Sequence, residues 1–401
     1  MALTPLAEAL ERILAEEFSA PALETCRLMD ALGRVLAEDV HSPLAVPFDD
    51  NSAMDGYALR AADSSVELRV TQRIAAGSCG VKVEPGTAAR IFTGAPIPPG
   101  ADAVVMQENC QLEGDRLQLL QAVGSGENIR TRGQDIAEGD VVFSAGRRLR
   151  GEDLGVLASI GMGQVSVRKR LKVAILSTGD ELVEPSPDAG LKPGQIFNSN
   201  RYTLHGLLSE LGAEVLDFGL VADTPEATAS ALEQAAAAAD LVISSGGVSV
   251  GEEDHVKSQV EKLGELRLWK LQIKPGKPLA YGRIGDTPFF GLPGNPAAVF
   301  VTFSMLVRPW LQQRQGMSAT APLSLQARAD FERSRAGGRQ EYLRAKACMR
   351  DGELWATLHS NQSSGVLSSV SWANALVVMP PGATVAAGDR VELLLLDQLN
   401  R

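Results

Sequence analysis

Cysteine and histidine are both scarce in this chain, which has only four of each among 401 residues. No two cysteines are close enough to form a CxxC pair, and no histidines form an HExxH motif, so we do not expect a zinc site. Four unclustered cysteines are typical of reduced thiols rather than a disulfide framework. We therefore expect a protein of a reducing compartment, with the cytoplasm as its location.

Positive net charge and long apolar runs are also missing. The formal net charge is -11, which argues against non-specific binding to nucleic acid or to an anionic membrane. No segment has the length of charge-free apolar sequence that a membrane span requires. Charged side chains also interrupt the N-terminal segment, which excludes a signal peptide; they are Glu8, Glu11, Arg12, Glu16 and Glu17.

The length and the changes of pattern along the chain predict a multidomain protein of α/β plus β type. We expect four domains. They are a helical domain formed by residues 1–45 and 144–170, an inserted β domain at 46–143, a doubly wound α/β domain at 171–316, and a C-terminal, barrel-like β domain at 317–401.

Helical patterns flank the predicted insert. Residues 6–14 carry an amphipathic stripe, with Thr4 as the expected N-cap and Pro5 at the first helical position. A second helix is predicted around residues 28–36, and a third over 147–162. Between them, short apolar runs alternate with glycine and proline clusters, which is typical of a small β module.

Regular α/β alternation follows. Apolar runs predict strands at 171–176, 214–220, 240–244, 268–273 and 289–292. Helices are predicted at 202–211, at 224–239 with Thr224 as N-cap and Pro225 next, and at 297–311. This alternation favours a doubly wound sheet. In the tail, alternating residues 343–349, the pair Asp351-Gly352 and the segment ELWATL predict a β-hairpin.

The predicted strand ends carry polar and glycine-rich loops. Ligands of open parallel sheets bind at the carboxyl ends of the strands. The loops at this edge are Ser177–Glu181, the region of Asp223, SSGGVSVGEED at 244–254, KPGKP at 274–278 and GLPGNP at 291–296.

Three chemical tasks suit these loops. Gly246, Gly247 and Gly251 allow close approach of the backbone to a phosphate. Lys274 and Lys277 supply positive charge for oxyanions. A hard divalent cation such as Mg²⁺ suits four acids that are spread over the loops; they are Asp180, Glu181, Asp223 and Asp254. Each piece alone also has a structural explanation as a turn or a solvated acid, and their common position at one edge favours a phosphorylated ligand.

One motif offers a different chemistry. Residues 247–251 read GVSVG, which matches the nucleophile elbow of serine hydrolases, with Ser249 as nucleophile and His255 or His359 as partner. We rank this hypothesis below phosphate binding because His255 is too close in sequence and because acids follow the serine.

Taken together, SSGGVSVGEED, STGDEL, KPGKP and GLPGNP resemble the substrate domain of the molybdopterin molybdenumtransferases, the MoeA family that includes the E domain of gephyrin. DNSAMDGYA at 50–58, FTGAPIPPGADAVV at 92–105 and NIRTRGQDI at 128–136 extend the resemblance over nearly the whole chain. It implies an adenylyltransferase-like α/β domain and an elongated homodimer. It also implies an enzyme that inserts molybdate into adenylylated molybdopterin and releases AMP with Mg²⁺.

The resemblance also implies roles for individual residues. Asp180, Glu181, Asp223 and Asp254 are expected at Mg²⁺ and the pyrophosphate. The residues expected to bind the substrate or molybdate are Thr178, Gly246, Gly247, Ser249, Gly251, Lys270, Lys274, Lys277, Pro293, Pro296, Arg344 and Ser364. Asp55, Thr93 and Asp135 are expected to complete the site from the inserted domain of the partner subunit. The sequence departs from the pattern at Asn198, where many relatives have an acid.

The implied partners are the substrates, a second copy of the chain, the adenylyltransferase of the same pathway and downstream molybdoenzyme chaperones. Two rival functions remain open. One is a molybdopterin adenylyltransferase, against which the three additional domains argue. The other is a non-catalytic molybdopterin-binding scaffold, against which the retained acids and lysines argue.

Overall fold

The computed structural model describes residues 3–17, 20–247, 255–317 and 322–399. The chain divides into two compact units, which are described separately. The first unit contains Met1–Glu24, Gly33–Ala37 and Val167–Arg401, and the second contains Thr25–Leu32 and Glu38–Ser166. No helix in the described ranges combines the length and the hydropathy of a membrane-spanning segment.

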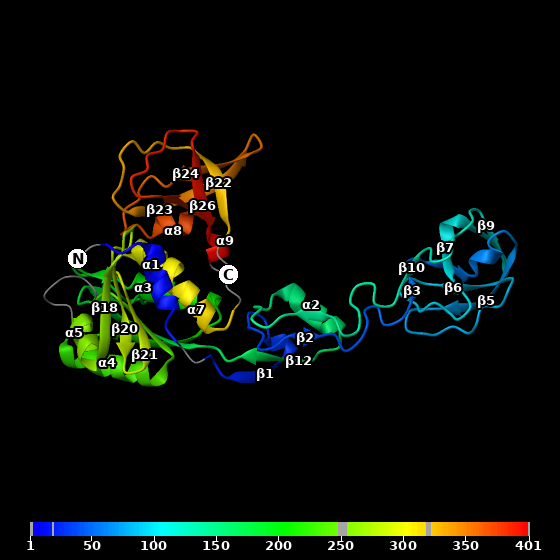
Figure 1. Cartoon of the computed structure of the whole chain (residues 1–401), viewed down its shortest axis with the longest axis horizontal. Helices are drawn as coiled ribbons and strands as arrows, with labels where there is room; N and C mark the ends of the chain where they lie inside the picture. Colours follow the sequence, from blue (N-terminus) through cyan, green and yellow to red (C-terminus); the bar gives the residue numbers. More distant parts are fainter. Residues whose placement is uncertain (1–2, 18–19, 248–254, 318–321, 400–401) are drawn as a thin grey trace. The chain divides into compact units, whose positions relative to one another are not determined.

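A mixed six-stranded sheet forms the centre of the first unit (Figure 1). Its strands, in spatial order, are β16 (Glu214–Val221), β13 (Lys172–Thr178), β17 (Leu241–Ser245), β21 (Thr287–Leu292), β20 (Pro278–Ile284) and β18 (Gly264–Lys270). The first four are parallel, whereas β20 and β18 are antiparallel to their neighbours. The sequence predicted a doubly wound sheet without a strand at 278–284, so this antiparallel edge was not foreseen. The turn at Gly285, which has φ +56°, joins β20 and β21 as a hairpin, so these strands run in opposite directions.

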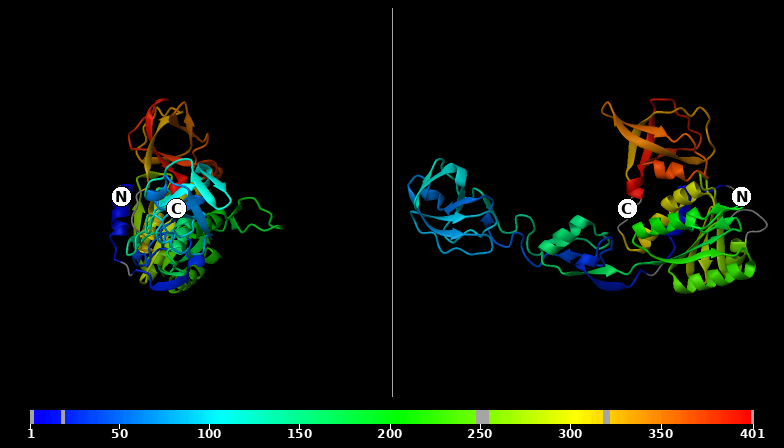
Figure 2. Two further views of the ribbon diagram at one scale, coloured as in Figure 1. Left: turned by 90° about the vertical axis from the view of Figure 1, so that its right-hand side faces the viewer. Right: turned by 180° about the vertical axis from the view of Figure 1, so that it is seen from behind.

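Helices cover both faces of this sheet (Figure 2). Because side chains alternate along a strand, Val173 and Ile175 belong to one buried cluster and Ala174 and Leu176 to another. The helices that pack on the first face are α1 (Leu6–Leu14), α3 (Ser199–Glu210), α6 (Pro296–Thr302) and α7 (Arg308–Arg314), and those on the second are α4 (Pro225–Ala238) and α5 (His255–Leu263). The parallel strands are thus buried on both sides, as their apolar runs require.

Local capping signals explain several helix starts. The Thr224 hydroxyl accepts the Ala227 N–H at 3.3 Å and Pro225 opens α4, as the sequence predicts. At α1, however, Pro5 occupies the N-cap position and Thr4 instead bridges to Leu271, so the predicted Thr4 cap is wrong. The predicted helix over 297–311 is interrupted by a π-helical turn, Phe303–Val307, between α6 and α7.

The C-terminal part of the first unit is a closed barrel of five strands. They are β22 (Ser324–Ala329), β23 (Gln340–Arg350), β24 (Glu353–Leu358), β25 (Ala375–Met379) and β26 (Arg390–Leu395), with β23 paired to both β24 and β25. The short strand β19 (Ile273–Lys274) extends this sheet. Asp351 and Gly352 have φ of +49° and +80°, which confirms the predicted hairpin. The helices α8 (Ser368–Trp372) and α9 (Leu396–Leu399) complete this part.

The second unit is mainly β. Its six-stranded sheet has the order β7 (Ala103–Met106), β4 (Gly56–Leu59), β6 (Thr87–Ile91), β5 (Leu68–Ile74), β9 (Arg116–Leu119) and β8 (Cys110–Glu113). Smaller ribbons pair β3 (Asn51–Ser52) with β10 (Ile129–Arg130) and β2 (Val40–His41) with β11 (Val141–Phe143). Short helices η2 (Ala61–Asp63) and η3 (Gln107–Asn109) follow β4 and β7. The predicted β module is confirmed.

The predicted helical N-terminal domain is wrong for most of its length. The segment 28–36 contains only the 3₁₀ turn η1 (Leu28–Asp30), after which Gly33 adopts φ +73°. The strand β1 (Leu23–Arg27) precedes it and pairs with β12 (Gln164–Arg168). Apart from α1, which packs on the α/β sheet, α2 (Gly151–Ser159) is the one α-helix among the described residues of this region, because pairing between distant segments overrides the local helical pattern.

Candidate active site

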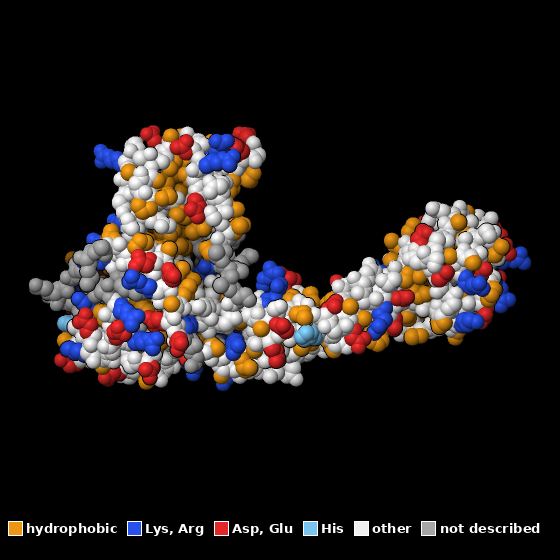
Figure 3. All heavy atoms as spheres, in the orientation of Figure 1, with side chains coloured by type: hydrophobic (Ala, Val, Ile, Leu, Met, Phe, Trp, Pro, Cys, Tyr) orange, Lys and Arg blue, Asp and Glu red, His pale blue; other side chains and the backbone are white. Residues whose placement is uncertain are grey.

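The carboxyl ends of β13, β17 and β21 surround a cavity of about 870 Å³ in the first unit. Ten of the predicted site residues line it: Thr178, Glu181, Asp223, Gly246, Gly247, Lys274, Lys277, Pro293, Pro296 and Ser364. Three others, Asp180, Lys270 and Arg344, lie outside its lining. Ser249, Gly251 and Asp254 fall outside the described residues, and so does the proposed serine nucleophile elbow beyond Gly247. Acidic and basic side chains are interspersed over the α/β layer on the face drawn in Figure 3.

Two glycines make the turn after β17 possible. Gly246 and Gly247 have φ of +90° and +67°. A Cβ on Gly246 would lie 2.8 Å from the Thr178 carbonyl oxygen, and one on Gly247 would lie 2.4 Å from Val256 Cγ2. The Gly246 N–H donates to the Leu292 carbonyl at 3.1 Å, so this amide serves the turn itself. The glycines therefore keep the cavity floor close to β13 and α5.

The lysine-bearing loop is anchored to the barrel. Lys274 Nζ donates to Glu341 Oε1 at 3.2 Å, and Arg333 contacts the other oxygen of this buried carboxylate at 2.8 Å. Gly276 has φ +113°, and its Cβ would meet Thr302 Oγ1 at 2.5 Å. Arg339 also lines the cavity and donates to the Ile273 carbonyl at 3.1 Å. Arg339 was not predicted as a site residue, since its place beside Lys274 depends on the β19–β23 pairing.

The predicted acids do not all line the cavity. Glu181 and Asp223 line the cavity, whereas Asp180 is exposed beside it. Among the described residues no group of three or more His, Cys, Asp or Glu side chains is placed to hold a metal ion. Two carboxylates, together with ligand phosphate and water, still suit Mg²⁺, which usually takes only one or two protein ligands at such sites.

Arg344 supports the cavity from behind. It is only 1% exposed, and its guanidinium donates to Ser369 Oγ and the Ser363 carbonyl, both at 3.0 Å. Burial lowers the pKa of this arginine. Its backbone N–H donates to the Gln362 side chain at 2.9 Å. Arg344 thus holds the 362–364 segment, which lines the cavity and was predicted only at Ser364.

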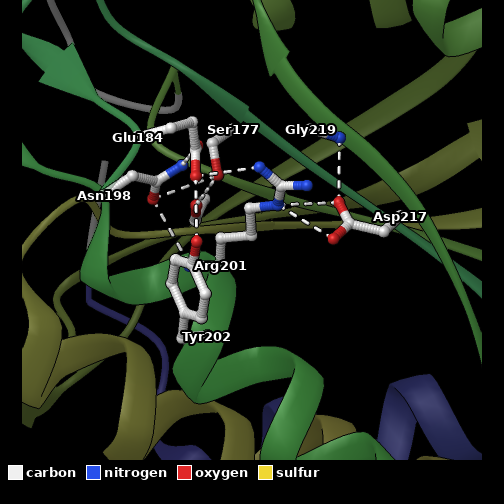
Figure 4. A network of polar contacts seen from close by, with 8 residues as sticks. Ser177, Glu184, Asn198, Arg201, Tyr202, Asp217 and Gly219 are labelled. Carbon is white, nitrogen blue, oxygen red and sulfur yellow. Dashed lines mark hydrogen bonds and ion pairs between the residues drawn. The ribbon is translucent and has the colours of Figure 1, made fainter. Parts of the chain in front are cut away.

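Asn198 forms the centre of a polar network at one wall (Figure 4). It caps α3 and is 1% exposed. Its amide Nδ2 donates to Glu184 Oε1 at 2.8 Å, so a carboxylate lies directly beside this asparagine. Arg201 Nη1 lies 2.8 Å from Glu184 Oε2, and its Nε donates to Asp217 at 2.9 Å. The hydrogen bond that Arg201 donates to Asp217 raises the pKa of Arg201.

The second unit brings together two of its three predicted site residues. Asp55 Oδ1 accepts hydrogen bonds from Thr93 N and Thr93 Oγ1, both at 2.8 Å. These bonds, the backbone one foremost, lower the pKa of the exposed Asp55 carboxyl. Asp135 is exposed, and its N–H donates to the Val46 carbonyl at 3.0 Å in a separate turn. A hollow of about 500 Å³ also lies in this unit, lined by residues that include Asp50, Cys79 and Arg132.

Comparison with known proteins gives matches over nearly the whole chain. Residues 4–161 match the model of the MoeA N-terminal region (domain I and II), residues 174–313 a probable molybdopterin binding domain, and residues 326–396 the MoeA C-terminal region (domain IV). The molybdopterin molybdenumtransferase of Haemophilus influenzae is 40% identical over 377 residues, covering 92% of this chain and 93% of that protein. The enzyme of the same name from Nostoc sp. is 39% identical and covers 93% and 88%.

Solved structures give the same result. The molybdopterin biosynthesis MoeA protein from Pyrococcus horikoshii superimposes with a TM-score of 0.85 at 31% identity, covering 98% of this chain and 100% of that chain.

Proposed function

Because this chain belongs to the MoeA family of molybdopterin molybdenumtransferases, we propose that it inserts molybdate into adenylylated molybdopterin and releases AMP. The observation that carries the proposal is the cavity at the strand ends, where glycine turns, lysines and acids of the predicted set face one another. A phosphate-binding turn alone, or a loop with only a structural role, would not require glycine turns, lysines and acids together.

The basic corner suits molybdate. Lys274, Lys277 and Arg339 line the same part of the chain's cavity, and molybdate is a dianion. Lysine and arginine bind such oxyanions by charge and by N–H donation. Arg344 contributes by holding Ser363, which lines the cavity together with the neighbouring Ser364.

The acidic corner suits a magnesium-bound pyrophosphate. Glu181 and Asp223 would hold Mg²⁺, together with Asp254, which lies outside the described residues. When bound, the ion neutralises charge on the phosphoanhydride as it is cleaved. Thr178 and the turn at Gly246 bound the same corner and limit the ways in which the phosphates can be placed.

We further infer that the working enzyme is a cytoplasmic homodimer in which Asp55, Thr93 and Asp135 of one subunit complete the cavity of the other. Support comes from the Asp55–Thr93 pair: an exposed carboxylate whose pKa is lowered by two hydrogen bonds is kept ionised and oriented without any buried partner. We expect the pathway adenylyltransferase to supply the adenylylated molybdopterin. Molybdoenzyme chaperones are expected to receive the finished cofactor.

The test is AMP release from adenylylated molybdopterin, with molybdate and Mg²⁺ added separately and together. Release that needs both ions and yields active cofactor supports the proposal. Asp223→Asn should lose this activity, whereas the matched variant Asp188→Asn, at an exposed acid outside the cavity lining, should keep it. Consumption of ATP with adenylylated product would instead indicate an adenylyltransferase, and tight binding without turnover would indicate a scaffold.

A further inference from the structure

A row of hydrogen bonds connects a surface carboxylate with the floor of the cavity (Figure 4). Glu184 Oε1 accepts from Asn198 Nδ2 at 2.8 Å, and Asn198 Oδ1 accepts from the Ser177 hydroxyl at 3.4 Å. The Ser177 and Ser245 hydroxyl oxygens are 3.1 Å apart. Ser245 ends β17 and lines the cavity at 2% exposure, and Ser177 lies behind it, outside the lining, at 1% exposure.

The amide of Asn198 has one permitted orientation. The Glu184 carboxylate, when ionised, only accepts hydrogen bonds, so Asn198 must present Nδ2 to it. On the other side, the backbone N–H of Arg201 can only donate, and it points to Asn198 Oδ1 at 3.4 Å. Both neighbours demand the same orientation, so the oxygen faces Ser177.

This orientation determines the direction of the hydroxyl protons. Because Asn198 Oδ1 only accepts, the single proton of Ser177 is directed to it. The proton in the contact between the serines must then come from Ser245. The oxygen of Ser245 is left with its lone pairs as the hydrogen-bonding group that this residue offers to a ligand.

Glu184 is itself fixed from a second side. Arg201 Nη1 lies 2.8 Å from its other oxygen, and Tyr202 Oη donates to that oxygen at 3.4 Å. Arg201 is in turn held by Asp217. The row therefore begins at a carboxylate whose position is set by α3 and β16, not by solvent.

We propose that Glu184 is a positioning residue that makes Ser245 a hydrogen-bond acceptor, so that this part of the floor binds an N–H donor of the substrate. The donor is an amino group or ring N–H of a fused heterocycle, since a phosphate or molybdate oxygen would meet lone pairs here. The choice between the pterin and the adenine ring rests on the proposed function. The inference that Ser245 accepts a hydrogen bond from the ligand does not depend on that function.

The experiment measures equilibrium binding of AMP, of 2-amino-4-oxopteridine and of inorganic phosphate to the full-length protein. The variants are Glu184→Gln, Ser245→Ala and the combination of both. In Glu184→Gln the single amide oxygen stays with Arg201 and Tyr202, so the amide NH2 faces Asn198 and favours the reversed Asn198 amide over the longer contact from the Arg201 N–H. For one of the two heterocycles, each single variant should therefore bind about tenfold more weakly, the effect of one hydrogen bond in a cavity. The double variant should bind no more than about twofold more weakly than either single variant, because both changes remove the same interaction. Phosphate binding should stay within about twofold, since phosphate does not use this acceptor.

Two controls separate positioning from general damage. Asp188→Asn removes an exposed acid of the same segment and should leave all three affinities unchanged. The exchanged pair Glu184→Gln with Asn198→Asp keeps an acceptor toward Ser177 and should return binding to within about threefold of the wild-type value. Additive losses in the double variant, unchanged affinity for both heterocycles, or absence of heterocycle binding by the wild-type protein would each overturn the proposal. Because none of these readouts requires turnover, a failure of the transferase reaction would be recognised separately.

Discussion

Glu341 lies opposite Lys274 in the β19–β23 pairing, and its carboxylate accepts a hydrogen bond from the lysine ammonium at 3.2 Å. Glu341 is 5% exposed and also contacts Arg333, so one buried acid balances two cations. Lys274 is half-exposed and lines the cavity. The positive charge that the lysine offers to an anion is thus partly offset by the residue that holds it in place.

Replacing Glu341 by glutamine should therefore have two opposite effects. Stability should fall by about 1–3 kcal/mol, because Arg333 and Lys274 lose their shared counter-charge. Phosphate should bind about three- to tenfold more tightly, because the potential at the lysine becomes more positive. Urea unfolding and calorimetric titration with phosphate would measure the two effects.

Glu353→Gln is the matched control for this variant. Glu353 pairs with Arg328 on the same barrel and is about half-exposed, outside the cavity lining. The stability of this variant should stay close to that of the wild type, because the pair is exposed to solvent, and its phosphate affinity should change by no more than about twofold. Weaker phosphate binding by Glu341→Gln would show that the carboxylate acts only by holding Lys274 in position.

Two inactive variants should complement each other if the active site is shared between subunits. Asp55→Asn and Asp223→Asn remove residues from different units of the chain. In a random mixture of co-expressed subunits, half of the dimers carry one intact cavity, so activity should recover to about a quarter of the wild-type value. Molybdate-dependent AMP release by the co-purified proteins measures this recovery. Activity that stays at the level of the separate variants would mean that each subunit builds its cavity alone.

The Asp55 carboxyl should titrate at a higher pH when the Thr93 hydroxyl is removed. In Thr93→Val the backbone bond at 2.8 Å stays and the side-chain bond is lost, so the pKa of Asp55 should rise only part of the way to its ordinary value. Carboxyl-carbon NMR titration would detect the change. Since the folded pKa is lowered, these bonds favour the folded state above the ordinary pKa and cease to do so as the pH falls through the folded value. An unchanged pKa in Thr93→Val would assign the whole shift to the backbone.

The stability of the second unit should depend on Asp153 at the start of α2. This side chain is 2% exposed and accepts from Arg147 Nη2 at 2.7 Å, Arg147 Nε at 3.0 Å and the Arg150 N–H at 2.9 Å. Burial alone would raise the pKa of Asp153, but these bonds outweigh it and lower the pKa. Asp153→Asn should cost about 1–3 kcal/mol of unfolding free energy.

Acid dependence gives a second readout of Asp153. Because its folded pKa is lowered, its contribution is complete above the ordinary carboxyl pKa near 3.8 and disappears as the pH falls through the lower folded value. The wild type should therefore lose stability in this acidic range by more than the Asn variant does. Parallel acid dependence of the two proteins in urea unfolding would contradict the assignment.

Local signals in the sequence were sufficient for much of the α/β unit. The buried run that became β13 and the Thr224–Pro225 start of α4 each depend on a few neighbouring residues. The loops at the strand ends could be assigned to one site because the carboxyl ends of parallel strands lie at the same edge of the sheet. The Asp351–Gly352 hairpin is equally local.

Other features depend on partners that are distant in the chain. The helix predicted over 28–36 fails because Leu36 bridges to Val167 and Gly33 turns the backbone. To predict the antiparallel edge of the sheet, one must know that β20 pairs with β21. Arg339 and Glu184 carry no motif of their own. Arg339 lines the cavity and donates to the Ile273 carbonyl, whereas Glu184 lies outside the lining and reaches it through the hydrogen bond from Asn198.

The pairing of β19 with β23 makes the lysine loop a strand of the barrel as well as a connection of the α/β sheet. The Gln340 N–H donates to the Gln272 carbonyl at 2.9 Å, and the Gln272 side chain donates to the Gly338 carbonyl at 3.1 Å. The loop therefore cannot shift without its neighbour, and a tilt of the barrel pulls Lys274 with it. Barrel and lysine loop are thus coupled through these hydrogen bonds, and any tilt of the barrel would change the width of the cavity at Lys274.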